Sequence, residues 1–499
     1  MKILYIPLDE RPCNYKFPQM IVSPKEDIQL LVPDKNTLSQ KKQPAKMEEL
    51  WDFVEENIQY CEYAVLSLDM LLYGGLLPSR MHYYSKEVVN TRLERIKNLS
   101  KSCKIFAFQC IMRCPQYNSS EEEPDYYEEY GEQIFKRAYY RDKAERFKID
   151  EIEKKELNNI TIPDDIIFDY ESRRTFNLAF NLAAVDLVKE GYVDTLVIPQ
   201  DDSSEFGYTA ISQKKVVDYV KKNNLEEKVF IYPGADEVGS SLLARILNKE
   251  VLNRTLKVYP FFSAVLGPTI VPLYEDRPIL ESLKHHVRII NGEIVENAEK
   301  ADLILAYNTC GKVMQESFDQ EYQDLSYTSY RNVLDFVLNI KTYIDKGYKV
   351  SICDSAFSNG SDLTLLKLLN SHSLLDKLYG YAGWNTNCNS LGTVLSMSAY
   401  GLDLREHKKL VKHLTYRYIE DGIYQAIVRQ EVIKEVLAKN GLSYYDFKGC
   451  QSMVEEEILK RCQKLYENFK ISTLYNFKID SINMPWRRMF EIDLNLIEG

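Results

Sequence analysis

The feature that most restricts the fold of this 499-residue chain is a repeated alternation of short apolar runs with longer segments of helical periodicity. The apolar runs lie at residues 3–8, 64–68, 105–111, 195–199, 229–232, 258–265, 303–307 and 350–353, with a further short run at 29–32. The helical segments between them include 44–61, 88–99, 173–190, 211–223, 238–247 and 330–346. Buried strands that alternate with helices predict a parallel β-sheet, because parallel neighbours require long crossover connections.

Eight strand–helix units match the count of a (β/α)8 or TIM barrel, and we expect an α/β fold of this type over residues 1–400. An open doubly wound sheet in two lobes would show the same alternation. Residues 115–172 interrupt the third unit with an acidic, aromatic stretch and then a Lys- and Glu-rich one, which predicts an insertion or lid. Residues 401–499 have helical patterns without further strand signals, so a mainly helical C-terminal region is expected.

The composition indicates a globular protein and argues against partners with many phosphates. Hydrophobic residues make up 45% of the chain and charged residues 27%, which is enough to form a large core. Lys and Arg total 63 against 74 Asp and Glu, a formal net charge of -11. Nucleic acids and anionic membranes require a positive surface, so neither is an expected partner.

Targeting and cofactor signals are also absent from the sequence pattern. The first apolar run ends in charged residues after a few positions, and no apolar stretch approaches the length of a membrane span. The ten cysteines are scattered and the six histidines form no ligand motif, so we expect reduced thiols, no resident metal or other cofactor, and a cytoplasmic protein. No pattern reports the oligomeric state.

Polar side chains gather directly after the apolar runs, where the C-terminal ends of parallel strands would carry a site. A helix cap explains one Asp, Ser or Asn in each such loop but does not require two acids in succession. In chain order the candidate site residues are Asp9, Glu10, Arg11, Asn14, Asp69, Tyr73, Arg80, Arg113, Asp201, Asp202, Asp236, Glu237, Asn308, Asp354 and Asn359.

Two pairs of neighbouring acids stand out among these residues. Adjacent carboxylates repel each other, so Asp201–Asp202 and Asp236–Glu237 are costly features at strand ends. Carboxylate pairs suit glycoside hydrolysis, in which one acid protonates the leaving oxygen and another stabilises the oxocarbenium-like centre. A solvated loop or a helix cap is the structural alternative, and it is stronger for Asp236 and Glu237, which follow a Pro-Gly turn.

Two further segments supply candidate substrate-binding side chains. In YAGWNTNCNSLG (381–392), Trp384 could stack on a sugar and Asn385 could bind hydroxyls; the alternative is a helix entry that Asn385 caps, with a buried Trp384. In the segment that begins at Arg173, Asn177 and Asn181 lie four residues apart on one helical face. If that face points at the site, Arg173 and Asn177 could hold an anionic or hydroxylated group.

Other common catalytic motifs are missing. The sequence has no GxSxG, GxxxxGK[ST] or strand-linked GxGxxG, which removes elbow-type serine hydrolases, P-loop enzymes and typical dinucleotide binding. A Mg²⁺ or Mn²⁺ ion held by Asp9, Asp69, Asp201 or Asp354 remains an open alternative, because hard cations need only clustered carboxylates.

Five motifs in order resemble the uncharacterised bacterial family called domain of unknown function 4127. They are PLDERPCN (7–14), SLDMLLYGGL (67–76) with Ser79 and Arg80, PQDDSS (199–204), GADE (234–237) and YAGWNT (381–386). The resemblance spans residues 1 to about 400 and implies that these strand ends serve one site, without naming a reaction.

The Asp201–Asp202 step and the Trp-Asn loop also resemble the active sites of barrel-fold β-N-acetylhexosaminidases and O-GlcNAc hydrolases. By that resemblance Asp202 would be the general acid and Asp201 would orient the acetamide of an N-acetylated sugar. We therefore expect a glycoside hydrolase, of the retaining substrate-assisted type, acting on a small carbohydrate or glycoconjugate. A metal-dependent hydrolase or lyase that uses the same acids, and a non-catalytic sugar- or peptide-binding protein, are the alternatives.

Overall fold

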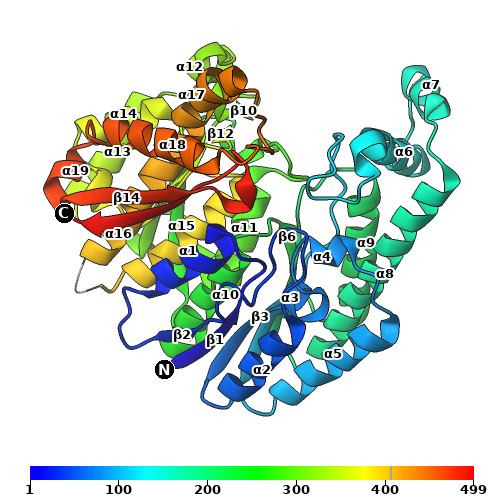
Figure 1. Ribbon diagram of the computed structural model, residues 1–499. Helices are drawn as coiled ribbons and strands as arrows, with labels where there is room; N and C mark the ends of the chain where they lie inside the picture. Colours follow the sequence, from blue (N-terminus) through cyan, green and yellow to red (C-terminus); the bar gives the residue numbers. More distant parts are fainter. Residues whose placement is uncertain (405–406) are drawn as a thin grey trace. The chain divides into compact units, whose positions relative to one another are not determined.

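A computed structural model describes residues 1–404 and 407–499 and divides the chain into two compact units (Figure 1). The first unit comprises Met1–Glu10, Asp27–Gly239 and Tyr274–Asp276. The second comprises Arg11–Glu26, Ser240–Leu273 and Arg277–Gly499. Each unit has its own parallel sheet.

The sheet of the first unit has six parallel strands in the order β2-β1-β3-β4-β5-β6. They are β1 (Lys2–Ile6), β2 (Gln29–Leu31), β3 (Tyr63–Ser67), β4 (Lys104–Phe108), β5 (Thr195–Gln200) and β6 (Val229–Pro233). The order reverses at β1, because β2 lies on one side of it and β3 on the other. In open parallel sheets, ligands bind beyond the carboxyl ends of the strands at such a reversal.

Helices cover this sheet. They include α2 (Met47–Ile58), α3 (Leu68–Tyr73), α4 (Pro78–Met81), α5 (Lys86–Leu99), α8 (Asp164–Lys189) and α9 (Tyr208–Lys222). One of them, α3, continues directly from the strand before it. α2 packs on β1, α3 on β3 and β4, α8 on β5 and α9 on β6, and α8 and α9 lie side by side (Figure 1).

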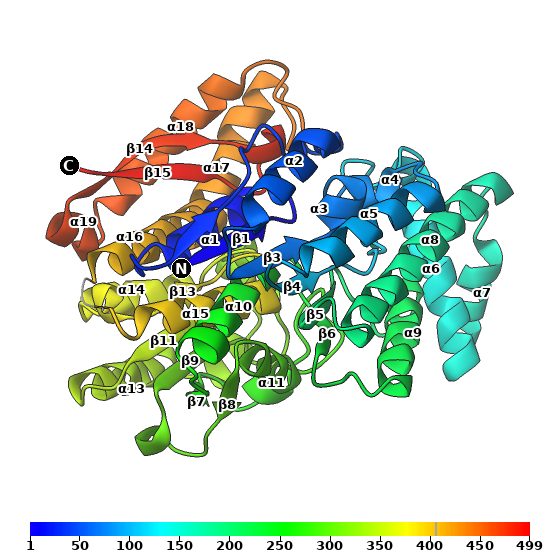
Figure 2. The ribbon, with the colours of Figure 1, turned by 90° about the horizontal axis from the view of Figure 1, so that it is seen from below.

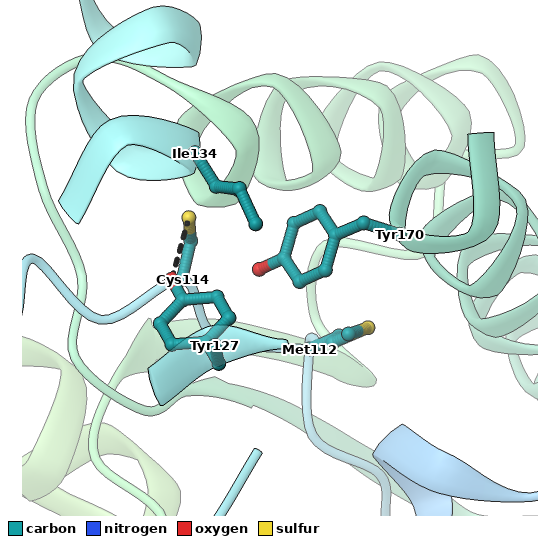
Figure 3. Close-up of a cluster of buried hydrophobic side chains, with 5 residues drawn as sticks. All are labelled: Met112, Cys114, Tyr127, Ile134 and Tyr170. Atoms are coloured by element: carbon teal, nitrogen blue, oxygen red, sulfur yellow. Dashed lines mark hydrogen bonds between the residues drawn. The ribbon is translucent and has the colours of Figure 1, made fainter. Parts of the chain in front are cut away.

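The insertion expected at 115–172 contains a loop, α6 (Tyr127–Arg146), α7 (Glu151–Asn159) and the beginning of α8. A small apolar cluster fixes it to the end of β4 (Figure 3). The cluster consists of Met112, Cys114, Tyr127, Ile134 and Tyr170. The Tyr127 hydroxyl lies 3.5 Å from the Cys114 sulfur and donates to the carbonyl of Pro115 at 2.7 Å, so its polar group is satisfied inside the cluster.

The sheet of the second unit has five parallel strands in the order β13-β11-β9-β7-β8. They are β7 (Leu256–Phe262), β8 (Gly292–Ile294), β9 (Leu303–Thr309), β11 (Val350–Ser355) and β13 (Tyr381–Ala382). Counted from β7, this is the same path that the first sheet follows from β1. Helices that contact the sheet include α11 (Ile279–Ile289), α13 (Val333–Asp345) and α15 (Asn387–Gly401), while α14 (Leu363–Ser371) packs beside α13.

Both sheets are open, so the expected closed (β/α)8 barrel is wrong and the open, two-lobed alternative describes the chain. Closure would need all strands in one sheet with paired ends. Instead, within the described residues, the first sheet ends at β2 and β6 and the second at β13 and β8. In a barrel each strand pairs with the strands before and after it in the sequence. Here the order reverses at β1 and at β7, so β2 and β8 lie on the other side of β1 and β7 from the strands that follow them.

The C-terminal region belongs to the second unit, so the expected boundary near residue 400 does not divide the chain; residues 405 and 406 lie outside the described part. Its helices include α16 (Lys408–Arg417), the π-helix η6 (Tyr418–Val428), α17 (Arg429–Val432), the π-helix η7 (Ile433–Leu437), α18 (Gln451–Tyr466) and α19 (Lys470–Tyr475). It ends in an antiparallel hairpin that the sequence did not predict, β14 (Phe477–Asn483) and β15 (Asp493–Glu498) (Figure 2).

Candidate functional site

The Asp201–Asp202 pair lies at the carboxyl end of β5 and is held by two arginines from other strand ends. Arg80 Nη2 lies 2.8 Å from Asp201 Oδ2. Arg113 Nη1 lies 3.1 Å from Asp202 Oδ2 and 3.7 Å from Asp201 Oδ2. Asp202 has a φ of 46°, a left-handed conformation that non-glycine residues rarely adopt, and it turns this carboxyl toward Arg113.

Two glutamates from the insertion complete a four-carboxylate cluster, defined as Glu122, Glu123, Asp201 and Asp202. Glu123 is only 1% exposed, and its Oε1 lies 3.1 Å from Arg80 Nη1 and 2.8 Å from Arg113 Nε. Glu122 Oε2 lies 2.9 Å from Arg113 Nη2. The cluster contains more carboxylates than guanidinium groups, so full ionisation would leave uncompensated negative charge.

The protonation of Asp202 reflects this imbalance. Burial, and then the charge of the neighbouring Asp201, raise the pKa of Asp202 to about 7, against the opposing effect of Arg113. Asp201 is the carboxylate that Arg80 contacts most closely. Asp202 can therefore keep its proton near neutral pH beside the carboxyl group of Asp201, and a carboxylic acid of this kind can act as a proton donor.

A second buried acid lies beside β4. Asp69, at the start of α3, is fully buried; its Oδ2 accepts from the backbone N–H of Cys110 at 2.8 Å and its Oδ1 has no hydrogen-bond partner. Burial raises the pKa of Asp69 to about 7. Burial is the largest cause of the raised pKa of the Cys110 thiol, and the charges of Asp69, Asp201 and Asp236 raise it further. Acids from the ends of β3, β5 and β6 therefore lie near the same side chain.

The inward face of α8 reaches the same strand end. Asn181 Nδ2 donates to the carbonyl of Cys110 at 3.2 Å, and Asn177 is 2% exposed. Arg173, one turn earlier, points elsewhere: it contacts Asp169 at 2.6 Å and the His82 carbonyl at 3.1 Å. Arg173 is therefore not part of the candidate site. The neighbouring Arg174 faces it instead and donates to the Arg113 carbonyl at 2.9 Å.

The remaining acids of the first unit occupy the ends of β1 and β6. Glu10 accepts from the Ser39 hydroxyl and from the Lys41 N–H, each at 2.7 Å, and burial with the charge of Asp9 raises its pKa. Glu237 accepts from the Ala235 N–H at 3.0 Å, a local turn contact that matches the structural alternative.

Tyr73 lies at the end of α3, and burial keeps the pKa of its hydroxyl well above the usual value.

Seven of the predicted site residues belong to the second unit instead of the first. They are Arg11, Asn14, Asn308, Asp354, Asn359, Trp384 and Asn385. The predicted set therefore divides between two sheets, each with its own carboxyl edge.

Asp354, at the end of β11, forms a satisfied buried network. Its Oδ1 accepts from Asn308 Nδ2 at 2.9 Å, and its Oδ2 accepts from the Tyr381 hydroxyl at 2.8 Å and the Asp362 N–H at 2.9 Å. Asp362 caps α14 and pairs with Arg331. Burial, and then the charge of Asp362, raise the pKa of Asp354 to about 7. Because both carboxylate oxygens of Asp354 already accept hydrogen bonds from the protein, this network orients the loop that follows β11.

Trp384 is packed and is not presented to a ligand. It is 6% exposed; the Phe17 ring lies edge-on at 5.8 Å, and the Arg417 guanidinium lies 5.6 Å from its centroid. Its indole N–H donates to Thr393 Oγ1 at 3.2 Å. The structure thus favours a buried Trp384 over sugar stacking, but the N-cap position of α15 is Thr386 and not Asn385, and the Thr386 side chain makes no capping hydrogen bond.

The four-carboxylate cluster also depends on residues that the sequence did not single out as site residues. Glu122 and Glu123 belong to the acidic, aromatic stretch of the insertion, and nothing in their spacing indicates that they contact Arg80 and Arg113. In the second unit, Asp362 and Arg331 were missed for the same reason.

A family model described as a protein of unknown function (DUF4127) matches residues 3–495. The chain belongs to this family. No curated protein matches it. A solved structure of the cobalamin-dependent S-adenosylmethionine radical enzyme OxsB, with aqua-cobalamin and S-adenosylmethionine bound, is 12% identical with a TM-score of 0.18. The match covers 91% of this chain and 63% of that enzyme, so this chain spans less than two thirds of its length. A likeness this weak carries no argument.

The five motifs that resemble the DUF4127 family are divided between the two units. SLDMLLYGGL, PQDDSS and GADE lie in the first unit, YAGWNT lies in the second, and PLDERPCN crosses from one to the other after Glu10. The match to residues 3–495 also takes in the C-terminal region, beyond the extent expected from the motifs.

Two properties of the described residues bear on the alternatives for this DUF4127 protein. Among residues 1–404 and 407–499, no group of three or more His, Cys, Asp or Glu is arranged to hold a metal ion. In the same part of the chain, no helix combines the length and apolar character that a membrane crossing requires.

Proposed function

We propose that this DUF4127 protein is a glycoside hydrolase whose reaction takes place at the carboxyl edge of the first sheet. Asp202 donates its proton to the glycosidic oxygen, and the carboxylate of Asp201 stabilises the positive charge that develops on the sugar. The observation that carries this proposal is the pair of adjacent acids with different environments, one paired with Arg80 and the other with a pKa raised to about 7.

The spacing of the pair supports a retaining mechanism. Arg113 Nη1 lies 3.7 Å from Asp201 Oδ2 and 3.1 Å from Asp202 Oδ2, so the two oxygens are no farther apart than these distances combined. For these two oxygens the bound lies below most of the roughly 6.5–9.5 Å range of inverting glycosidases and includes the roughly 5–5.5 Å of retaining ones, a comparison that applies to the form in which Asp201 is the nucleophile. In the substrate-assisted form, the amide N–H of an N-acetylated sugar donates to Asp201.

The charge of the site favours neutral sugars. The four-carboxylate cluster has two guanidinium groups, Arg80 and Arg113, both engaged in ion pairs. An anionic sugar would add negative charge to a region that already has an excess, whereas hydroxyls and amides can bind carboxylates as donors. Hexosides and N-acetylhexosaminides are therefore the expected substrates.

A panel of aryl glycosides tests the proposal. Wild type is expected to turn over at least one hexoside or N-acetylhexosaminide, and Asp202→Asn to lower kcat by roughly 10²–10⁴-fold. The loss should be large for a poor leaving group and small for dinitrophenol, which needs no protonation. Asp218→Asn, an exposed acid on α9 paired with Lys214, is the control and should retain activity. Absence of turnover on every glycoside, or equal losses for both leaving groups, would refute the assignment.

A further inference from the structure

Arg429, the first residue of α17, is a buried cation without an acidic partner. Its side chain is 4% exposed, it forms no ion pair with any described carboxylate, and its Nε has no hydrogen-bond partner. Its hydrogen-bond partner is neutral, because Nη2 donates to the Asn359 carbonyl at 3.4 Å. A buried charge is normally compensated by an opposite charge, so this guanidinium is incomplete as it stands.

An unused acceptor lies one helical turn before it. Gln425 is also 4% exposed; its Nε2 donates to the Phe490 carbonyl at 2.6 Å, which fixes the orientation of the amide, and its Oε1 has no partner. Gln425 lies in the π-helix η6, and Gly360 packs against its Cβ. π-helical segments are rare and often occur at functional sites.

One side of the helical run formed by η6 and α17 lies along the loop after β12 (Phe357–Ser358). The Asp421 carbonyl accepts from the Ser361 N–H at 2.9 Å, Gln425 lies against Gly360, and Arg429 reaches the Asn359 carbonyl. Successive turns therefore align Gln425 and Arg429 along one backbone segment.

The surroundings of Arg429 carry further positive charge. Burial raises the pKa of Tyr444, and the charges of Arg429 and Arg488 both oppose this rise, so the two guanidinium groups lie near one hydroxyl. Arg488 packs 4.5 Å over the Trp486 ring and lies 3.4 Å from Glu491, which partly balances it. Arg429 remains the uncompensated charge of this group.

We propose that Arg429 and Gln425 form an anion-binding site in the second unit, distinct from the carboxylate pair of the first unit. An unused cationic donor beside an unused acceptor fits an oxyanion that also carries a hydroxyl, such as hydrogen phosphate or a 2-hydroxycarboxylate. The charged oxygens accept from Arg429, and the O–H of the ligand donates to Gln425 Oε1. This inference does not depend on glycoside hydrolysis.

Binding is tested on the full chain with inorganic phosphate and lactate as probes, and with acetate and chloride at equal ionic strength as references. Calorimetric titration is expected to show binding of phosphate or lactate that is at least about tenfold weaker in Arg429→Gln and unchanged in Lys434→Gln. Lys434 is an exposed cation on the adjoining η7 and controls for net charge. Failure of phosphate and lactate to bind more tightly than acetate and chloride, or equal affinity in Arg429→Gln, would overturn the site.

A second measurement separates binding from a purely structural role. If the role of Arg429 is to bind an anion, Arg429→Met removes an uncompensated buried charge from the ligand-free chain. Its melting temperature should then rise or stay constant. The same variant should lose the increase in melting temperature that phosphate or lactate gives wild type. A lower melting temperature together with an undiminished ligand effect would show that Arg429 only supports the fold.

Discussion

The carboxyl group of Asp202 lies among opposing charges, so its proton responds to single neighbouring side chains. After burial, Asp201 and Glu122 raise its pKa, while Arg113 and Arg80 lower it. The sequence could single out the acid pair, because capping does not call for two acids in succession. It could not identify the partners, since Arg80 and Arg113 lie about a hundred residues away along the chain and meet Asp201 and Asp202 only in the folded sheet.

Removal of the Glu122 charge should release the proton of Asp202 more easily. In Glu122→Gln we expect the pKa of Asp202 to fall by on the order of one unit, because an anion near the carboxyl is lost and Arg113 is freed toward it. If Asp202 is the acid, the alkaline limb of the pH–activity profile shifts to lower pH by the same amount as the pKa. Carbon NMR of the Asp202 carboxyl measures the pKa shift without any substrate.

Glu121→Gln provides the matched comparison, since Glu121 pairs with Lys41 outside the four-carboxylate cluster. Its alkaline limb should stay where the wild-type limb is. An unchanged Asp202 titration in Glu122→Gln would contradict the electrostatic account of this site.

At the scale of elements, the sequence located strands better than helix faces. Every apolar run proposed as a strand overlaps one, including β2, because continuous burial in a parallel sheet leaves an apolar signature. The short strands β8, β10 (Gln315–Glu316), β12 and β13 and the hairpin of β14 and β15 were missed. On α8, a shift of one residue turns the side chain by roughly 100°, which separates the inward Arg174 from Arg173.

The insertion helix α6 allows a test in which propensity and packing oppose each other. Alanine favours a helix over glycine by about 1 kcal/mol. A Cβ at Gly131, however, would lie 2.4 Å from the Tyr127 ring and 2.6 Å from the Tyr117 carbonyl, and Tyr127 is fixed inside the cluster of Figure 3. Gly131→Ala should therefore destabilise the chain by roughly 1–3 kcal/mol in chemical denaturation.

The exposed neighbour Glu132 provides the control, and Glu132→Ala should change the unfolding free energy by only a few tenths of a kcal/mol. If Gly131→Ala were as stable as wild type or more so, the packing of α6 against this cluster would be wrong.

For the whole molecule, the alternation of strands and helices established the α/β class but not the closure of its sheets. Each strand contributes the same kind of apolar run to an open sheet as to a barrel, and the reversals at β1 and β7 leave no mark in the runs themselves. The division of the predicted site between two units follows from this, because residues at equivalent strand ends belong to different sheets.

Buried acids in both units make the stability of the molecule depend on pH. Burial, the first cause for each group, raises the pKa of Asp69, Asp202 and Asp354 to about 7 and that of Glu420 to about 8. Their folded-state pKa values exceed the unfolded ones, so the stabilisation is complete below about pH 4 and is lost as pH rises through 7 and 8. The half-buried His82 and the buried His413 have lowered pKa values, so they reduce stability only as the pH falls below about 6.5.

Between about pH 6.5 and 8 only the acids contribute, and we expect the melting temperature to fall by several degrees across this window. Asp69→Asn keeps an acceptor for the Cys110 N–H but no longer titrates, so its curve should be flatter. A melting temperature that stays level or rises between pH 6.5 and 8 in wild type would contradict the raised pKa values.

The alternation of the two units along the chain has a consequence for biosynthesis. Helix α1 (Pro12–Val22) belongs to the second unit and packs on α15 and α16, which emerge from the ribosome more than 350 residues later. At about 5–20 residues per second, α1 remains without these partners for tens of seconds. The side chains of α1 that are buried in the folded chain therefore lack their partners in α15 and α16 for most of translation.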